Sequence, residues 1–187
     1  MPPHYHNLTK QILIYLAIGG IIALAATSPY FAQSILYQLF KKRSKETINR
    51  RKFSQALSRL KKAQLLILEE RENGKFLVRL TERGKRKIKE FQFENLKIER
   101  PKKWDGIWRI IIFDIPEKKK IGREALRNKL KDLGFYQLQE SVFAFPYPCE
   151  PEIEFIVEFF DLSSYVNFIE TSKIKNDVRA RKYFNLL

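Results

Sequence analysis

The sequence predicts an α+β protein made of two small domains. Three observations support this prediction. An Asn-Gly turn between two short strand patterns follows a basic helix pattern, the second half of the chain alternates strands and helices, and the positive charge is concentrated in the middle of the chain. We place the domains at residues 8–93 and 104–171, with a linker at 94–103 and a C-terminal tail at 172–187.

The net charge of +15 is distributed unevenly. Residues 1–40 carry +1, residues 41–103 carry +14, and residues 104–187 carry no net charge. This concentration is typical of a surface that binds a polyanion, with nucleic acid first and an anionic membrane second. The one cysteine, Cys149, excludes an intramolecular disulfide framework and indicates a reducing, cytoplasmic setting. One Cys and two His residues cannot complete a four-ligand zinc site.

The first element expected is a helix in the apolar run at residues 12–26. This run is shorter than the roughly 20 residues that a bilayer requires. We therefore expect a helix buried in the first domain or in a dimer interface, and no membrane contact. A membrane anchor over residues 12–37 is the alternative. Ser28 and Pro29 then begin a second helix, with Ser28 as the N-cap.

A third helix is expected at residues 48–63, with Thr47 as a plausible N-cap. Its apolar residues fall on one face at the helical period: Phe53, Ala56, Leu57 and Leu60. The opposite face carries basic, amide and hydroxyl side chains, which can reach phosphates and base edges as a recognition helix requires. An ordinary solvated helix face is the alternative for this pattern taken alone.

The turn Asn73-Gly74 separates two strand patterns, residues 65–70 and 76–80, and Thr81 then caps a helix from Glu82 to about Phe91. Helix, helix, basic helix, hairpin and helix is the element order of a winged helix-turn-helix domain. We predict that this domain binds DNA through side chains of the third helix and the hairpin: Arg50, Arg51, Lys52, Gln55, Ser58, Arg59, Lys62, Arg71, Asn73, Gly74 and Lys75. Residues 59–88 also resemble the wing region of winged-helix transcription regulators, above all in the segment Leu80-Thr81-Glu82-Arg83-Gly84.

The second domain begins with an apolar strand that ends at Asp114. A basic helix follows and ends at Gly134, and then come two strands or one bent strand, a further helix and a last strand. This is the β-α-β-β-α-β order of a ferredoxin-like domain. The predicted elements are residues 107–113, 121–133, 135–139, 141–145, 150–160 and 165–170.

The second domain contains the motifs Trp104-Asp105-Gly106, Trp108-Arg109, Phe113-Asp114-Ile115-Pro116-Glu117, Leu133-Gly134-Phe135 and Leu138-Gln139. These motifs resemble the central domain of PaaX-type transcriptional repressors. The run Gln139-Glu140-Ser141-Val142-Phe143 is similar to one in the small CRISPR-associated nuclease of the Cas-two type. Together with the winged-helix half, the element order resembles PaaX-like repressors from about residue 10 to residue 170.

This resemblance implies a sequence-specific DNA-binding transcriptional regulator, specifically a repressor, that acts on double-stranded DNA as a homodimer without a cofactor. We expect the neutral second domain to dimerise. In the nuclease family, the Asp that ends the first strand is proposed to hold a divalent metal across the dimer axis. That position is Asp114, so the resemblance makes Asp114 a candidate catalytic and Mg²⁺-binding residue. A turn-capping role for Asp114 is the structural alternative.

Three other functions remain as alternatives. The first is a metal-dependent endonuclease that acts on RNA or DNA through Asp114. The second is a DNA-binding adaptor of the CRISPR type, and the third is a membrane-tethered adaptor. The sequence names neither an operator nor a small-molecule effector.

Overall fold

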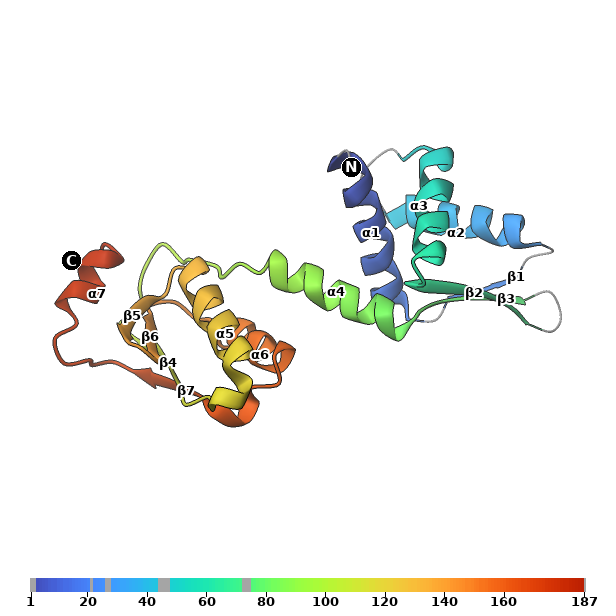
Figure 1. The fold of residues 1–187 in the computed structure, drawn as a ribbon. Coiled ribbons are helices and arrows are strands. Elements are labelled where there is room, and N and C mark those ends of the chain that lie inside the picture. Colours follow the sequence, from blue (N-terminus) through green and yellow to red (C-terminus); the bar gives the residue numbers. More distant parts are fainter. Residues whose placement is uncertain (1–2, 21, 26–27, 44–47, 72–74, 187) are drawn as a thin grey trace. The chain divides into compact units, whose positions relative to one another are not determined.

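The computed structural model describes residues 3–20, 22–25, 28–43, 48–71 and 75–186. The chain combines helices with antiparallel sheets, which confirms the predicted α+β class. It divides into two compact units, Met1–Glu94 and Asn95–Leu187, and we call them the first and the second unit. Figure 1 shows the helices and strands of both units.

The first unit contains four helices and a three-stranded sheet among its described residues. Helices α1 (Pro3–Gly19), α2 (Pro29–Arg43), α3 (Arg50–Lys62) and α4 (Glu82–Glu94) accompany strands β1 (Ile22–Ala25), β2 (Leu66–Arg71) and β3 (Lys75–Leu80). The strand order is β1-β3-β2, and both pairings are antiparallel. The helices and the sheet share one core, in which the ring centroid of Phe53 lies 5.4 Å from that of Tyr37 and 5.3 Å from that of Phe40.

The apolar run at residues 12–26 is split between two elements. Helix α1 ends at Gly19, and Gly20 has φ +64°, a left-handed conformation that glycine adopts without strain. Strand β1 then pairs with β3, with Ile22 opposite Val78 and Leu24 opposite Phe76. The expectation of one helix through this run was therefore wrong. Among the described residues, no helix is both long enough and apolar enough to cross a membrane.

The second unit has a four-stranded antiparallel sheet with the order β5-β6-β4-β7. Its elements are β4 (Trp108–Phe113), α5 (Lys120–Asp132), β5 (Tyr136–Gln139), β6 (Val142–Phe145), α6 (Glu150–Phe159), β7 (Val166–Thr171) and α7 (Val178–Tyr183), with short 3₁₀ turns at Glu117–Lys119 and Ser163–Tyr165. Helices α5 and α6 lie over the same face of the sheet (Figure 1). The residues at 135–145 form two strands, with an irregular register between Gln137 and Gln139.

The opposite face of this sheet is packed against the C-terminal segment. Trp108, Ile110 and Ala144 form a buried cluster with Ala180 of α7, and Phe184 packs against this cluster. Asp177 accepts a hydrogen bond from Trp108 Nε1 (3.2 Å). The predicted C-terminal tail therefore contains helix α7, and Ala180 of this helix is part of the core of the second unit.

Candidate nucleic-acid interface

Helix α3 has one face in the core and one in solvent. Asn49 is its N-cap: the N–H of Arg51 donates to Asn49 Oδ1 (2.8 Å), and Thr47 lies outside the described residues. The predicted core face is confirmed, since its four apolar side chains are all buried: Phe53, Ala56, Leu57 and Leu60. Burial of this face against the sheet and α2 fixes the side of α3 that meets solvent.

The solvent face of α3 carries every predicted contact residue of this helix in an exposed position: Arg50, Arg51, Lys52, Gln55, Ser58, Arg59 and Lys62. Arg51, Gln55, Ser58 and Lys62 are three or four residues apart, so they form one row directly opposite the core face. Lys61 is also exposed and was missed; the helical period would have placed it at the margin of this row. The row combines cations for phosphates with an amide and a hydroxyl that can bond base edges.

The β2–β3 hairpin brings two further predicted residues together. Arg71 and Lys75 are directly opposite each other in the antiparallel register, and both are exposed. Like charges in this arrangement destabilise a strand pair unless a counter-charge is near. Glu69 supplies part of this counter-charge, because its carboxylate accepts hydrogen bonds from Arg71 Nη2 (2.7 Å) and Arg79 Nη2 (3.0 Å). The turn residues Asn73 and Gly74 lie outside the described residues.

The connection from β3 to α4 is held by hydrogen bonds of Thr81 and by a close backbone approach at Gly84. Thr81 Oγ1 donates to the carbonyl of Gln64 (2.7 Å) and accepts from the N–H of Gly84 (3.0 Å). A Cβ on Gly84 would lie 1.9 Å from the carbonyl oxygen of Leu65, so only glycine fits there. Within the Leu-Thr-Glu-Arg-Gly segment, Thr81 and Gly84 are therefore required by the structure of the connection from β3 to α4.

Helix α4 also carries exposed cations that the predicted contact residues did not include: Arg83, Lys85, Arg86 and Lys89. Lys85 forms an ion pair with Glu82 (2.7 Å), and its hydrogen bond lowers the pKa of the Glu82 carboxyl. The positive surface of the first unit thus extends beyond α3 and the hairpin. The excess of Lys and Arg along residues 82–89 of the sequence could have predicted this extension of the positive surface.

Asp114 is exposed and directly follows β4. Its N–H donates to the carbonyl of Tyr165 (3.0 Å), so the backbone at this point is fixed by the connection before β7. Glu117 lies three residues after Asp114 and forms an ion pair with Arg123 (2.8 Å). The hydrogen bond from Arg123 is the main reason that the pKa of the Glu117 carboxyl is lowered. Among the described residues, no group of three or more His, Cys, Asp or Glu side chains could hold a metal ion. One chain therefore offers Asp114 as a single carboxylate ligand, which fits part of a Mg²⁺ site and not a whole one.

The Trp-Asp-Gly-x-Trp-Arg motif ahead of β4 forms a bonded unit. Arg109 is 5% exposed, and its guanidinium donates to both carboxylate oxygens of Asp105 (2.7 and 2.9 Å) and to Glu170 of β7 (2.9 Å). It also donates to the carbonyls of Ile107 (2.9 Å) and Pro146 (3.2 Å). The hydrogen bond to Arg109 is the main reason that the pKa of Asp105 is below its ordinary value. These residues carried the resemblance, and their role here is structural.

Cys149 does not add a reactive group to the second unit. Its side chain is buried, and burial raises the pKa of its thiol to about 12. The thiolate is the reactive form of cysteine, so this residue is inert near neutral pH.

One segment of the second unit matches a protein-family model. No curated protein matches the chain. Residues 101–182 match the family model described as the PaaX protein central Cas2-like domain. The matched segment includes the Trp-Asp-Gly-x-Trp-Arg motif, Asp114, the whole four-stranded sheet and most of α7. This segment of the second unit is therefore similar to the central Cas2-like domain of PaaX proteins.

Proposed function

We propose that this protein is a sequence-specific transcriptional repressor that binds double-stranded DNA as a homodimer. The observation that carries the proposal is the exposed row on α3, where cations, an amide and a hydroxyl lie opposite a fully buried face. A helix of this kind can enter the major groove and combine phosphate contacts with base readout. The family relationship of the second unit supports the assignment to PaaX-like regulators.

The first unit serves in this proposal as a winged helix-turn-helix domain. Helices α2 and α3 precede the β2–β3 hairpin, and α4 follows it, which is the element order of that motif. Helix α3 is then the recognition helix, and the hairpin is the wing that contacts the DNA backbone through Arg71 and Lys75. The opposed positive charges of these two residues gain from a phosphate between or beside them.

The second unit serves as a ferredoxin-like dimerisation domain. Its strand order β5-β6-β4-β7 and its two helices on one face support this assignment. The other face has apolar side chains that α7 leaves partly exposed, among them Ile112, Val142 and Ile169, which is 43% exposed. A second copy that covers this patch would pair two recognition helices by two-fold symmetry, and the DNA site would be an inverted repeat.

Selection of binding sites from a random duplex library with the full chain tests this function. We expect enrichment of an inverted repeat. Arg51→Ala and Gln55→Ala should relax the base preference, since their side chains can reach base edges, whereas Lys62→Ala should weaken binding to all sequences alike. The charge-matched control is Lys131→Ala, which removes an exposed cation of α5 in the second unit. It should change neither the base preference nor the affinity for DNA. A library without enriched sequences would contradict the proposal.

The Mg²⁺-dependent endonuclease is the second candidate, and the exposed carboxylate of Asp114 at the end of β4 is what favours it. The repressor proposal expects Asp114→Ala to bind DNA like the parent protein. Incubation of labelled RNA and DNA with the protein, with and without Mg²⁺, separates the two candidates. Cleavage that requires Mg²⁺ and disappears in folded Asp114→Ala would establish the nuclease.

A further inference from the structure

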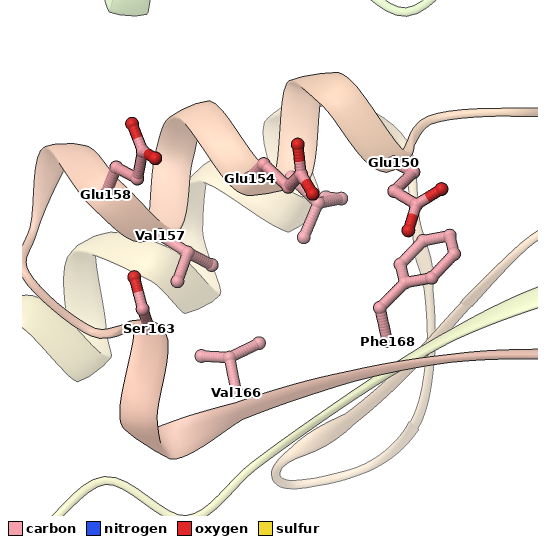
Figure 2. A pocket seen from close by; sticks show the side chains of 8 residues that line it. Glu150, Glu154, Val157, Glu158, Ser163, Val166 and Phe168 are labelled. Atoms are coloured by element: carbon pink, nitrogen blue, oxygen red, sulfur yellow. The ribbon is translucent and has the colours of Figure 1, made fainter.

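A groove lies between α6 and β7 in the second unit, with a volume of about 320 Å³ (Figure 2). Its apolar lining comes from both elements: Ile153 and Val157 of α6, and Val166 and Phe168 of β7. Its acidic rim comes from α6 alone: Glu150, Glu154 and Glu158. Ser163 lies at the end where the chain turns from α6 toward β7. The groove thus combines an apolar floor with one strongly charged edge.

The three glutamates form a row along the edge of the groove. They are four residues apart, so successive carboxylates lie on the same side of α6 at steps of about 6 Å. Figure 2 shows the three side chains in this row, next to the groove. All three are exposed, and within the described part of the chain none forms an ion pair with Lys or Arg.

Among the residues that the structure describes, these three neighbouring glutamates have no cationic partner, in a chain that is rich in cations. The chain has 36 Lys and Arg for 21 Asp and Glu, so cations are in excess. Some acidic residues of the second unit are paired, such as Glu170 with Arg109 (2.9 Å) and Asp161 with Lys119 (2.7 Å). Three neighbouring carboxylates without such partners repel one another, and a cationic partner would relieve that repulsion.

Strand β7 borders the groove and is an edge strand of the four-stranded sheet. All of its residues, Val166–Thr171, pair with β4 on one side. Its sequence, Val-Asn-Phe-Ile-Glu-Thr, contains neither the lysine nor the proline that commonly blocks an exposed edge. The backbone groups on its outer side are therefore available to an added strand, which is a common mode of peptide recognition.

We propose that this groove binds an extended basic segment of another protein, which adds as a strand beside β7 and places Lys or Arg at alternate positions toward α6. Alternate side chains of a strand are about 6.6 Å apart, close to the step of about 6 Å between the glutamates. Two or three cations can therefore meet the three carboxylates in register. Their aliphatic stems would cover the apolar floor, as Lys and Arg commonly do.

Charge disfavours two other occupants of the groove. A second copy of β7 would present Glu170 on the same face as Phe168, and this carboxylate would approach the acidic rim. Nucleic acid would bring phosphates to the same three glutamates. The groove is therefore suited to a partner different from the DNA that the first unit is proposed to bind.

Fluorescence anisotropy with a labelled probe peptide tests this proposal on the full chain. The probe is Thr-Lys-Val-Lys-Val-Lys-Thr, and the control peptide has the same composition with its three lysines adjacent. The protein variant is the triple substitution Glu150→Gln, Glu154→Gln and Glu158→Gln, which keeps the side-chain size. Asp132→Asn, at an exposed carboxylate of α5, is the matched control.

We expect the alternating peptide to bind the parent protein and Asp132→Asn equally. The triple variant should bind it about tenfold more weakly, because exposed ion pairs are individually modest. Hydrogen exchange should slow at the amides of β7 when the peptide binds. Equal binding by the triple variant, equal binding of the control peptide, absence of binding, or binding without protection of β7 would each overturn the proposal. DNA binding by the triple variant should be unchanged, which separates this inference from the proposed function.

Discussion

Arg109 is a buried cation whose hydrogen bonds join three parts of the second unit. It bonds Asp105 ahead of β4, Glu170 of β7 and the carbonyl of Pro146 after β6. Its aliphatic stem and guanidinium are almost completely removed from solvent, while its two carboxylate partners remain about half exposed. Loss of the guanidinium would therefore leave carbonyl acceptors without a donor while the carboxylates return to water.

Arg109→Met should lower the unfolding free energy of the second unit by about 3 kcal/mol. Arg109→Lys should have an intermediate effect, since an ammonium cannot bond both oxygens of Asp105 in parallel. Both tryptophans of the chain, Trp104 and Trp108, lie in the second unit. Denaturant titration followed by tryptophan fluorescence therefore measures this unit alone. Equal midpoints for Arg109→Met and the parent protein would contradict the structural role.

The contact between Arg109 and Asp105 also predicts a pH effect. The pKa of the Asp105 carboxyl is lowered in the folded chain, chiefly by the hydrogen bond from Arg109. A carboxyl whose folded pKa is below its unfolded value of about 4 stabilises the fold above that value and loses this contribution as the pH falls through the folded pKa. The parent protein should therefore lose stability below about pH 4 more steeply than Asp105→Asn does. Fluorescence-monitored denaturant titrations between pH 2 and 6 compare the two slopes, and parallel curves would refute the prediction.

At the level of secondary-structure elements, the start of α3 is set by tertiary packing. Thr47 and Asn49 are both suitable N-cap residues, so the local sequence does not decide between them. Ile48 is 8% exposed, and its carbonyl accepts a hydrogen bond from Tyr37 Oη of α2 (2.7 Å). This contact holds residue 48 outside the helix and leaves Asn49 as the cap.

Asn49→Ala should destabilise the first turn of α3 by about 1 kcal/mol, because the N–H of Arg51 loses its acceptor. Hydrogen exchange at the amides of Arg51 and Lys52 measures this change directly. Thr47→Ala is the matched control and should leave those amides unaffected. If Thr47→Ala accelerated exchange as much as Asn49→Ala, the assignment of Asn49 as the cap would be wrong.

Helix α7 is short, and its position depends on contacts with β4. Arg181 lies 4.7 Å from the centre of the Trp104 ring and bonds Asp177, which in turn accepts from Trp108 Nε1. Phe184→Ala should destabilise the second unit by about 2 kcal/mol, since its half-buried ring contacts Trp108 and Phe145. The tryptophan emission should shift to the red as Trp108 becomes solvated. Val178→Ala, at a residue that is 54% exposed, is the control and should change neither the stability nor the emission.

At the scale of the whole molecule, elements with strong periodicity could be predicted and short elements could not. The buried face of α3 follows from the spacing of its apolar residues, and the strand before Asp114 follows from its continuous apolar run. Strand β1 has four residues, and its conformation depends on pairing with β3, whose residues lie fifty or more positions later. Helix α7 has six residues and is held by Trp108. Likewise, Glu150, Glu154 and Glu158 read as the solvated side of a helix, and only the fold brings them beside the edge strand β7.

The charge distribution of the chain predicts how DNA binding depends on salt. The first unit, with 19 Lys and Arg against 7 Asp and Glu, carries +12 of the net charge of +15, so phosphate contacts should be concentrated there. If each protomer neutralises three to five phosphates, the logarithm of the dimer's binding constant should fall against the logarithm of salt concentration with a slope of about −5 to −9. Lys62→Gln, present in both protomers, should reduce the magnitude of this slope by about 2, since each lost phosphate contact accounts for about 0.9. Lys131→Gln in the second unit should leave it unchanged. Anisotropy titrations of one duplex at several salt concentrations measure these slopes, and a flat response, or an equal effect of the two substitutions, would contradict DNA binding through α3.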